Sequence, residues 1–389
     1  MKIDKFKSIA VMAPFSPDMY GGGAEVLREI LSIHPSNKLI WINTNKQVKA
    51  NRWWRLDVKC FEPLINFQRG FHIKYWKFIY KYLFRYIDKI YITNFVNDII
   101  KKNDIDLVWI ISDYSLLNSA SLLSKQLKIP YHISVHDDPS FSSEIFGDYL
   151  PKRNVEKYFA KIMKNSKSMD VISENMSKLY KSNFGKDSIV ITKGFNLDSL
   201  NKRNKVISLK KDLKIVMAGV SVNSKPWPEI MFDTLNYFNS NSSSKLHFYA
   251  FDKKLSQYDN PYVSVCSNMS VEEHKIFVEG MDLGYANDPL DHSEDFAVTS
   301  MPTKIITYIS YGIPFMYHGP SKAAIGDIIK EYSLGVHVHT DNKNDIIEGF
   351  NQLIKNYEFY SNNCNVFAEN NYNINKIRVS FYNLINSYK

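Results

Sequence analysis

The sequence predicts an α/β chain with two Rossmann-like domains in tandem, each built on a doubly wound parallel sheet. Short apolar runs, typical of buried strands, alternate with helix-spaced segments along the whole chain. A polar segment at 196–211 interrupts this alternation near the middle and reads as a linker. The length of 389 residues exceeds what one hydrophobic core usually serves, so two domains are expected.

In the first half, predicted strands alternate with predicted helices, as in successive βαβ units. Its strands read as continuous apolar runs because a parallel sheet is covered on both faces. This half is predicted to form a first domain over residues 1–200. We expect strands at 8–14, 38–43, 107–112, 131–136, 169–173 and 188–195, with helices at 24–33, 71–102, 116–127 and 155–164.

A second series of the same kind begins at Lys214 and predicts a second domain over 212–372, followed by a last helical segment at 373–389. Ser270 and Glu273 have the spacing of a capping box at a helix start. Two such domains are expected to place a ligand cleft between the carboxyl ends of their sheets. We expect strands at 215–220, 246–251, 262–266, 282–286, 315–317 and 335–339, and helices at 345–356, 359–370 and 374–387.

Composition limits the functional classes. The chain is 44% hydrophobic and 23% charged, which is ordinary for a globular protein, and its three widely spaced cysteines form neither a disulfide framework nor a metal-binding pair. The N-terminus does not resemble a signal peptide, and no apolar run spans a bilayer, so a cytoplasmic protein is expected. The net charge of +9 comes without a nucleic-acid motif. It favours a phosphorylated substrate or an anionic membrane surface over nucleic acid.

The stretch 301–320 reads as a short helix, a glycine stop and a buried strand. Pro302 suits a first helical turn, and Gly312 stands where a left-handed cap would end the helix. Lys304 in the first turn opposes the helix dipole, an arrangement that becomes favourable when an anion such as phosphate binds there. The alternative is a solvated surface lysine beside a helix that merely follows a proline.

A second lysine has the same setting. Lys225 follows a predicted strand and stands directly before Pro226, at the start of another predicted helix. Gly219 at the end of that strand lets the backbone approach a ligand closely. Two such lysines in one half of an α/β chain favour a diphosphate site.

Two motifs follow strands of the first half. The glycines at 21–23 enter a helix and leave N–H groups for an anion, although a flexible turn is the alternative. His136, Asp137 and Asp138 come at the carboxyl end of a strand, where polar side chains reach a ligand site. His136 can exchange a proton near neutral pH, and either aspartate could orient it or act as a base. The alternative is a pair of helix-capping aspartates beside a packed histidine.

The predicted helix at 71–102 carries basic residues on one side and apolar or aromatic residues on another. Such a helix suits an anionic membrane surface. The alternative is a core-facing helix with a solvated basic side. The basic positions are Lys74, Lys77, Lys81, Arg85 and Lys89.

With these residues in view, the chain resembles bacterial glycosyltransferases of the GT-B fold, especially family 4. The likeness spans nearly the whole length and is strongest from Pro302-Thr303-Lys304 to Gly312-Ile313-Pro314. It also covers the glycine loop, the motif at 136–138, and the stretches Val171 to Met176 and Lys193 to Asn196.

The resemblance implies that Lys225 and Lys304 hold the diphosphate of a sugar nucleotide, with Gly22 and Gly23 packed against it and His136 near the transferred sugar. It implies that Gly219, Thr303 and Thr307 belong to the same donor site. It also implies no bound metal or other cofactor, because lysines and helix ends offset the phosphate charge. The last helix would cross back onto the first domain.

The sequence departs from the family at two positions. The family usually carries two glutamates eight positions apart, and the corresponding residues here are Thr299 and Thr307. A threonine hydroxyl hydrogen-bonds more weakly than a carboxylate, so donor identity and stereochemistry stay open.

The resemblance implies a metal-independent transferase that moves a sugar from a nucleotide-diphosphate sugar to a saccharide or lipid-linked acceptor in surface polysaccharide synthesis, with retained configuration expected. The first domain would bind the acceptor and the second the sugar nucleotide. An inverting reaction would instead need His136, Asp137 or Asp138 as base. Two alternatives are a sugar-nucleotide epimerase and a non-catalytic subunit that binds the sugar nucleotide. The expected location is the cytoplasm, with peripheral contact at the inner face of the cell membrane.

Overall fold

The computed structural model describes residues 6–19, 22–44, 54–64, 77–141, 152–197, 212–219, 227–266, 269–290 and 294–387, without the side chains of 77–85, 271, 294 and 295. The chain divides into two compact units. Unit 1 comprises Met1–Gly194 together with Ile374–Lys389, and unit 2 comprises Phe195–Asn373. The two units are described separately below.

The sheet of unit 1 has seven strands, all parallel, in the order β3-β2-β1-β4-β5-β6-β7. The direction of connection reverses between β1 and β4, which makes this pair the topological switch point, where ligands of such sheets bind. The strands are β1 (Ile9–Ala13), β2 (Leu39–Asn43), β3 (Lys59–Phe61), β4 (Leu107–Ile111), β5 (Tyr131–Val135), β6 (Ser168–Val171) and β7 (Ile189–Val190).

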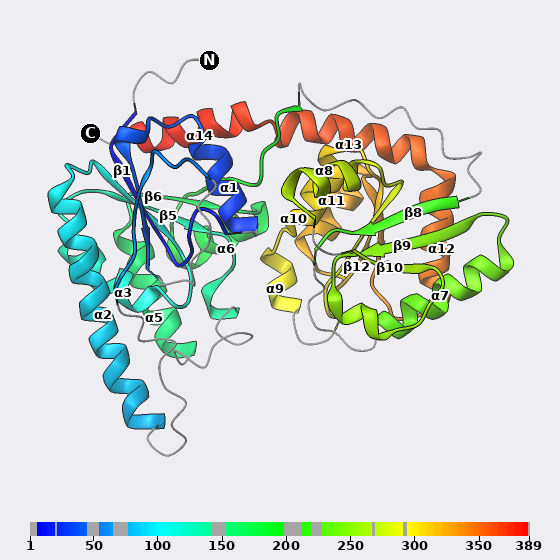
Figure 1. The fold of residues 1–389 in the computed structure, drawn as a ribbon, viewed down its shortest axis with the longest axis horizontal. Helices are drawn as coiled ribbons and strands as arrows, with labels where there is room; N and C mark the ends of the chain where they lie inside the picture. Colours follow the sequence, from blue (N-terminus) through cyan, green and yellow to red (C-terminus); the bar gives the residue numbers. More distant parts are fainter. Residues whose placement is uncertain are drawn as a thin grey trace. The chain divides into compact units, whose positions relative to one another are not determined.

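Helices cover both faces of this sheet (Figure 1). The core on one face joins the strands to the first and last helices of the unit. Its centre is aromatic, with the ring of Phe381 4.2 Å from the ring of Trp109. The helices are α1 (Gly22–Leu31), α2 (Lys77–Lys102), α3 (Leu117–Gln126), α5 (Lys152–Asn165), α6 (Glu174–Phe184) and α14 (Ile374–Asn386).

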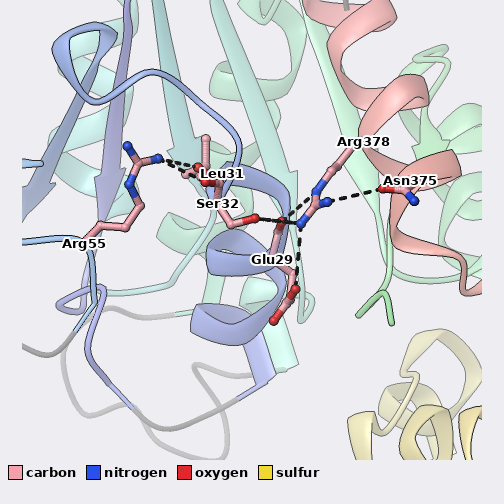
Figure 2. A network of polar contacts seen from close by, with 6 residues as sticks. All are labelled: Glu29, Leu31, Ser32, Arg55, Asn375 and Arg378. Atoms are coloured by element: carbon pink, nitrogen blue, oxygen red, sulfur yellow. Dashed lines mark hydrogen bonds and ion pairs between the residues drawn. The ribbon is translucent and has the colours of Figure 1, made fainter. Parts of the chain in front are cut away.

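One arginine of α14 hydrogen-bonds to the C-terminal end of α1, in addition to the apolar contacts between the two helices (Figure 2). Arg378 donates two hydrogen bonds, from Nε at 3.0 Å and Nη2 at 2.8 Å, to the backbone carbonyl of Glu29. The same Nη2 lies 2.6 Å from the hydroxyl of Ser32. The first two bonds satisfy the carbonyl of Glu29 in the last turn of α1, which has no backbone N–H partner within the helix.

The sheet of unit 2 has six parallel strands in the order β10-β9-β8-β11-β12-β13, so its switch point lies between β8 and β11. Its strands are β8 (Asp212–Met217), β9 (Lys245–Ala250), β10 (Val263–Val265), β11 (Leu283–Asn287), β12 (Phe315–His318) and β13 (Gly335–Val338). Its helices are α7 (Trp227–Asn241), α8 (Val271–Glu279), α9 (Glu294–Thr299), α10 (Thr303–Ser310), α11 (Ala324–Tyr332), α12 (Lys343–Lys355) and α13 (Tyr357–Asn371).

The predicted fold class is confirmed, with two parallel sheets flanked by helices. The capping box at Ser270 and Glu273 is present in full, and Gly312 has the expected left-handed conformation, with φ of 61°. The predicted helix at 71–102 is seen from Lys77 onward, and 71–76 lie outside the described residues. The short strand β3 and the helices α6, α9 and α11 are not among the predicted elements.

Candidate functional site

In unit 2, the residues that follow β8 and β11 lie at the switch point. Gly219 comes two residues after β8 and has φ of 105°, a conformation that side chains other than glycine rarely adopt. Asp288 directly follows β11 and is buried. Its carboxylate accepts a hydrogen bond of 2.8 Å from the hydroxyl of Tyr317, and burial raises its pKa.

Lys304 lies in the first turn of α10, as the sequence predicts. The N-cap is Pro302, whose side chain accepts no hydrogen bond from the helix, so the first N–H groups of α10 have no side-chain cap. Burial lowers the pKa of Lys304, and the carboxylates of Asp288 and Asp252 oppose that shift. The positive end of the helix and a half-buried ammonium group thus lie together at the carboxyl edge of the sheet, beside Thr303.

Tyr308 anchors α10 to the two strands of the switch point. Its buried hydroxyl accepts a 2.8 Å hydrogen bond from the N–H of Ala218, and it lies 3.0 Å from the carbonyl of Val216 and 2.9 Å from that of Tyr285. The ring packs where Gly284 has no side chain, since a Cβ there would lie 2.5 Å from the ring. This contact fixes the position of α10, and therefore of Lys304, relative to β8 and β11.

The two threonines at the positions of the family glutamates are buried. The hydroxyl of Thr307 donates to the carbonyl of Thr303 at 3.0 Å, and that of Thr299 donates to the carbonyl of Phe296 at 3.3 Å. Both hydroxyl protons are therefore used within their own helices. Each oxygen retains acceptor capacity, which leaves a weaker ligand than a carboxylate.

In unit 1, the glycine loop and the histidine motif meet. Gly22 begins α1, and an added Cβ on Gly23 would lie 2.7 Å from Nδ1 of His136. The imidazole therefore packs against the first turn of α1, at its positive end. Burial lowers the pKa of His136, opposed by the carboxylate of Asp170, so the ring is held neutral.

The two aspartates after His136 differ in their surroundings. Asp138 is buried, and its carboxylate accepts hydrogen bonds from the N–H of Ser140 at 2.8 Å and from the hydroxyl of Tyr180 at 2.7 Å. Asp137 is exposed, and its carboxylate makes no hydrogen bond or ion pair with the described residues.

Some predicted residues cannot be placed, and some placed residues were not predicted. Lys225 and Gly21 lie outside the described residues. Sequence reasoning missed Asp113, Asp252 and Asp288, although each closely follows a predicted strand. That position is the signal that could have identified them, because the carboxyl ends of parallel strands share one edge of a sheet.

Within the described ranges, no group of three or more histidine, cysteine, aspartate or glutamate side chains is arranged to hold a metal ion. No helix among the same residues combines the length and apolar character needed to cross a bilayer.

No protein-family model and no curated protein sequence matches the chain. Solved structures do match. Sucrose-phosphate synthase from Thermosynechococcus elongatus aligns with a TM-score of 0.71 at 10% identity, over 98% of both chains. HepE from Anabaena, in complex with UDP-glucose, aligns with a TM-score of 0.66 at 11% identity, over 98% of this chain and 100% of that chain. Trehalose-6-phosphate synthase, from a study of glycosyl transfer with retention, has a TM-score of 0.64 at 12% identity, over 97% and 99% of the two chains. Identities this low show the fold alone, and the fold is that of the GT-B glycosyltransferases.

Proposed function

We propose that this chain is a glycosyltransferase that uses a nucleotide-diphosphate sugar as donor. The observation that carries the proposal is Lys304 in the first turn of α10, at the carboxyl edge of the sheet in unit 2. A helix N-terminus with an ammonium group beside it binds phosphate groups well. The likeness to HepE, which was solved with UDP-glucose, supports a donor of this class.

Unit 2 would bind the donor. Displacement at the anomeric carbon breaks its bond to the diphosphate oxygen, and Lys304 and the N–H groups of α10 stabilise the charge that develops on the leaving group. Gly219 and Thr303 would allow close approach of the phosphates, and Thr307 would offer a hydroxyl acceptor. Lys225 would add a second ammonium group. No divalent metal is required in this scheme, so transfer should continue in excess EDTA.

Unit 1 would bind the acceptor, with neutral His136 beside the transferred sugar and Gly22 and Gly23 at the start of α1. We propose retained configuration, in which the acceptor oxygen bonds to the anomeric carbon and the departing phosphate takes the acceptor proton. Inversion would require a side-chain base. Among the three residues of the motif, Asp137 best meets that requirement because Asp138 already accepts two hydrogen bonds and the lowered pKa of His136 makes its imidazole a weaker base. The anomeric configuration of the product, read by proton NMR, decides between the two courses.

The acceptor would be a saccharide or a lipid-linked saccharide in surface polysaccharide synthesis. The protein would work in the cytoplasm, at the inner face of the cell membrane, with α2 facing anionic lipid. The net charge of +9 supports this location, since anionic leaflets attract basic surfaces.

Incubation with a panel of sugar nucleotides, with and without membrane extract, tests the proposal. A transferase releases nucleoside diphosphate only when acceptor is present. An epimerase converts the sugar nucleotide to its epimer without any acceptor. A binding subunit leaves the sugar nucleotide unchanged in both incubations. Lys304→Ala should abolish transfer and weaken UDP binding while leaving the circular dichroism spectrum unchanged. Lys330→Ala, an exposed lysine on α11, is the matched control. Wild-type transfer by Lys304→Ala would remove the proposed diphosphate site.

A further inference from the structure

Four lysines from three helices of unit 1 gather in one cluster. Lys89 comes from α2, Lys125 from the last turn of α3, and Lys157 and Lys161 from successive turns of α5. The helices lie side by side because α3 packs against both α2 and α5. Below, these four residues are called the lysine cluster.

The ammonium groups are close enough to repel one another. Lys125 is the main cause of a lowered pKa at Lys161, and Lys157 and Lys89 add to that effect. Lys89 is half-buried, with its Nζ 5.6 Å from the centre of the Tyr158 ring on α5. None of the four makes an ion pair with a carboxylate among the described residues. The cluster is therefore a concentrated positive charge without a counter-ion in the described part of the chain.

Apolar side chains flank this charge on α2. Tyr86 is 63% exposed, and Ile90 is 36% exposed. Tyr86 lies one turn before Lys89, and Ile90 directly follows it. Exposed aromatic and branched side chains beside lysines suit the boundary between lipid headgroups and acyl chains, where an apolar body and a charged tip are both solvated.

We propose that the lysine cluster is a docking site for the phosphate headgroups of an anionic lipid bilayer, with Tyr86 and Ile90 entering the interfacial layer. Charge complementarity identifies the occupant. Four ammonium groups that form no ion pair with a carboxylate among the described residues match several headgroup phosphates at once, and the flanking apolar residues favour lipid over a soluble anion. The inference rests on the membrane association proposed above, and it extends the contact from one helix to three.

Vesicle co-sedimentation tests the site. The triple variant Lys125→Glu/Lys157→Glu/Lys161→Glu should bind vesicles of phosphatidylcholine with phosphatidylglycerol about 100-fold more weakly, because each lysine near an anionic surface contributes about fivefold. Lys89 is left intact because it packs on Tyr158. The matched control Lys178→Glu/Lys330→Glu/Lys355→Glu changes net charge equally at exposed positions elsewhere, and it should bind within about threefold of wild type.

Two results would overturn the site. One is wild-type vesicle binding by the triple variant, and the other is an equal loss in the control, which would make net charge alone responsible. UDP binding by the triple variant, measured by calorimetry, should equal that of wild type because the lysine cluster belongs to unit 1 and Lys304 to unit 2. Failure of every nucleoside diphosphate in a panel to bind any of these proteins would count against the transferase, whereas failure of wild type to bind anionic vesicles would count against the membrane proposals.

Discussion

The phenol oxygen of Tyr382 in α14 lies 3.0 Å from Nδ1 of His34, in the turn that follows α1. The other ring nitrogen of His34 lies 3.1 Å and 3.2 Å from the carbonyls of Lys7 and Lys38. The neutral imidazole satisfies all three groups, with Nε2–H donating to the carbonyls and Nδ1 accepting from the phenol. Burial lowers the pKa of His34 to about 4 from its usual 6.5.

This histidine should make the fold of unit 1 sensitive to acid. The unfolded chain binds a proton at His34 below about pH 6.5, whereas the folded protein does not bind it until about pH 4. The contribution of His34 to the free energy of unfolding is therefore fully present above pH 6.5 and is lost as pH falls towards 4. The loss by pH 4 is about 3 kcal/mol. Urea unfolding of His34→Gln should show lower stability at pH 7 but a smaller decline on acidification, whereas exposed His339→Gln should follow wild type. Equal acid sensitivity in His34→Gln would contradict this account.

Arg378→Ala should loosen α14 from α1. The substitution leaves the carbonyl of Glu29 without its charged donor, at a cost of about 1.5 to 3 kcal/mol. Limited proteolysis should then cleave near the C-terminus, and the melting temperature should fall. The control is Glu29→Ala, which keeps the backbone carbonyl and removes only a half-exposed ion pair at 4.0 Å, so it should be nearly neutral. Equal losses in both variants would assign the docking energy to the ion pair instead.

Tyr308→Phe should affect both stability and donor binding. Without the hydroxyl, the N–H of Ala218 is buried without its acceptor, which costs about 1 to 3 kcal/mol. Because the same hydroxyl ties α10 to β8 and β11, we expect weaker UDP binding with the aromatic packing intact. Calorimetry and thermal melting measure the two effects. The control is Tyr332→Phe on the exposed end of α11. Wild-type UDP affinity in Tyr308→Phe would show that the hydrogen bonds of the Tyr308 hydroxyl do not position Lys304.

Gly23→Ala should displace the imidazole of His136, since the new Cβ would lie 2.7 Å from Nδ1. Crowding of this kind costs about 1 to 3 kcal/mol, less where the ring can turn aside. The double variant with His136→Ala should recover most of the lost stability, because the clash then has no partner. A double-mutant cycle by chemical denaturation measures the coupling. Additive losses would place the cause of the destabilisation elsewhere in the first turn of α1.

Local chemistry made much of this fold predictable. Buried strands showed as apolar runs, and Gly312 marked a helix end because only glycine adopts φ of 61° without strain. The capping box at Ser270 and Glu273 needs only residues three apart. Strand β3 was missed because its three residues at a sheet edge carry no periodicity and are not fully buried.

The site was predictable in its lysine and glycines but not in its carboxylates. Lys304 was identified because a lysine in a first helical turn is locally unfavourable. Asp252 and Asp288 act on Lys304 from the segments that follow β9 and β11, across sequence separations that no local pattern encodes. The contact of Tyr308 with Gly284 is of the same kind, because it depends on which helix crosses which strand.

The chain enters unit 2 at Phe195 and leaves it at Asn373, and these two residues form a β-bridge. The next residues outward, Gly194 and Ile374, are in close contact. A Cβ added at Gly194 would lie 2.9 Å from the Cα of Ile374. Unit 2 is thus inserted into unit 1 through neighbouring entry and exit points. During translation, the first 194 residues cannot complete the core around Trp109 until α14, which carries Phe381, has been synthesised. The insert can complete its own sheet sooner, so the portion translated later should reach its native state first.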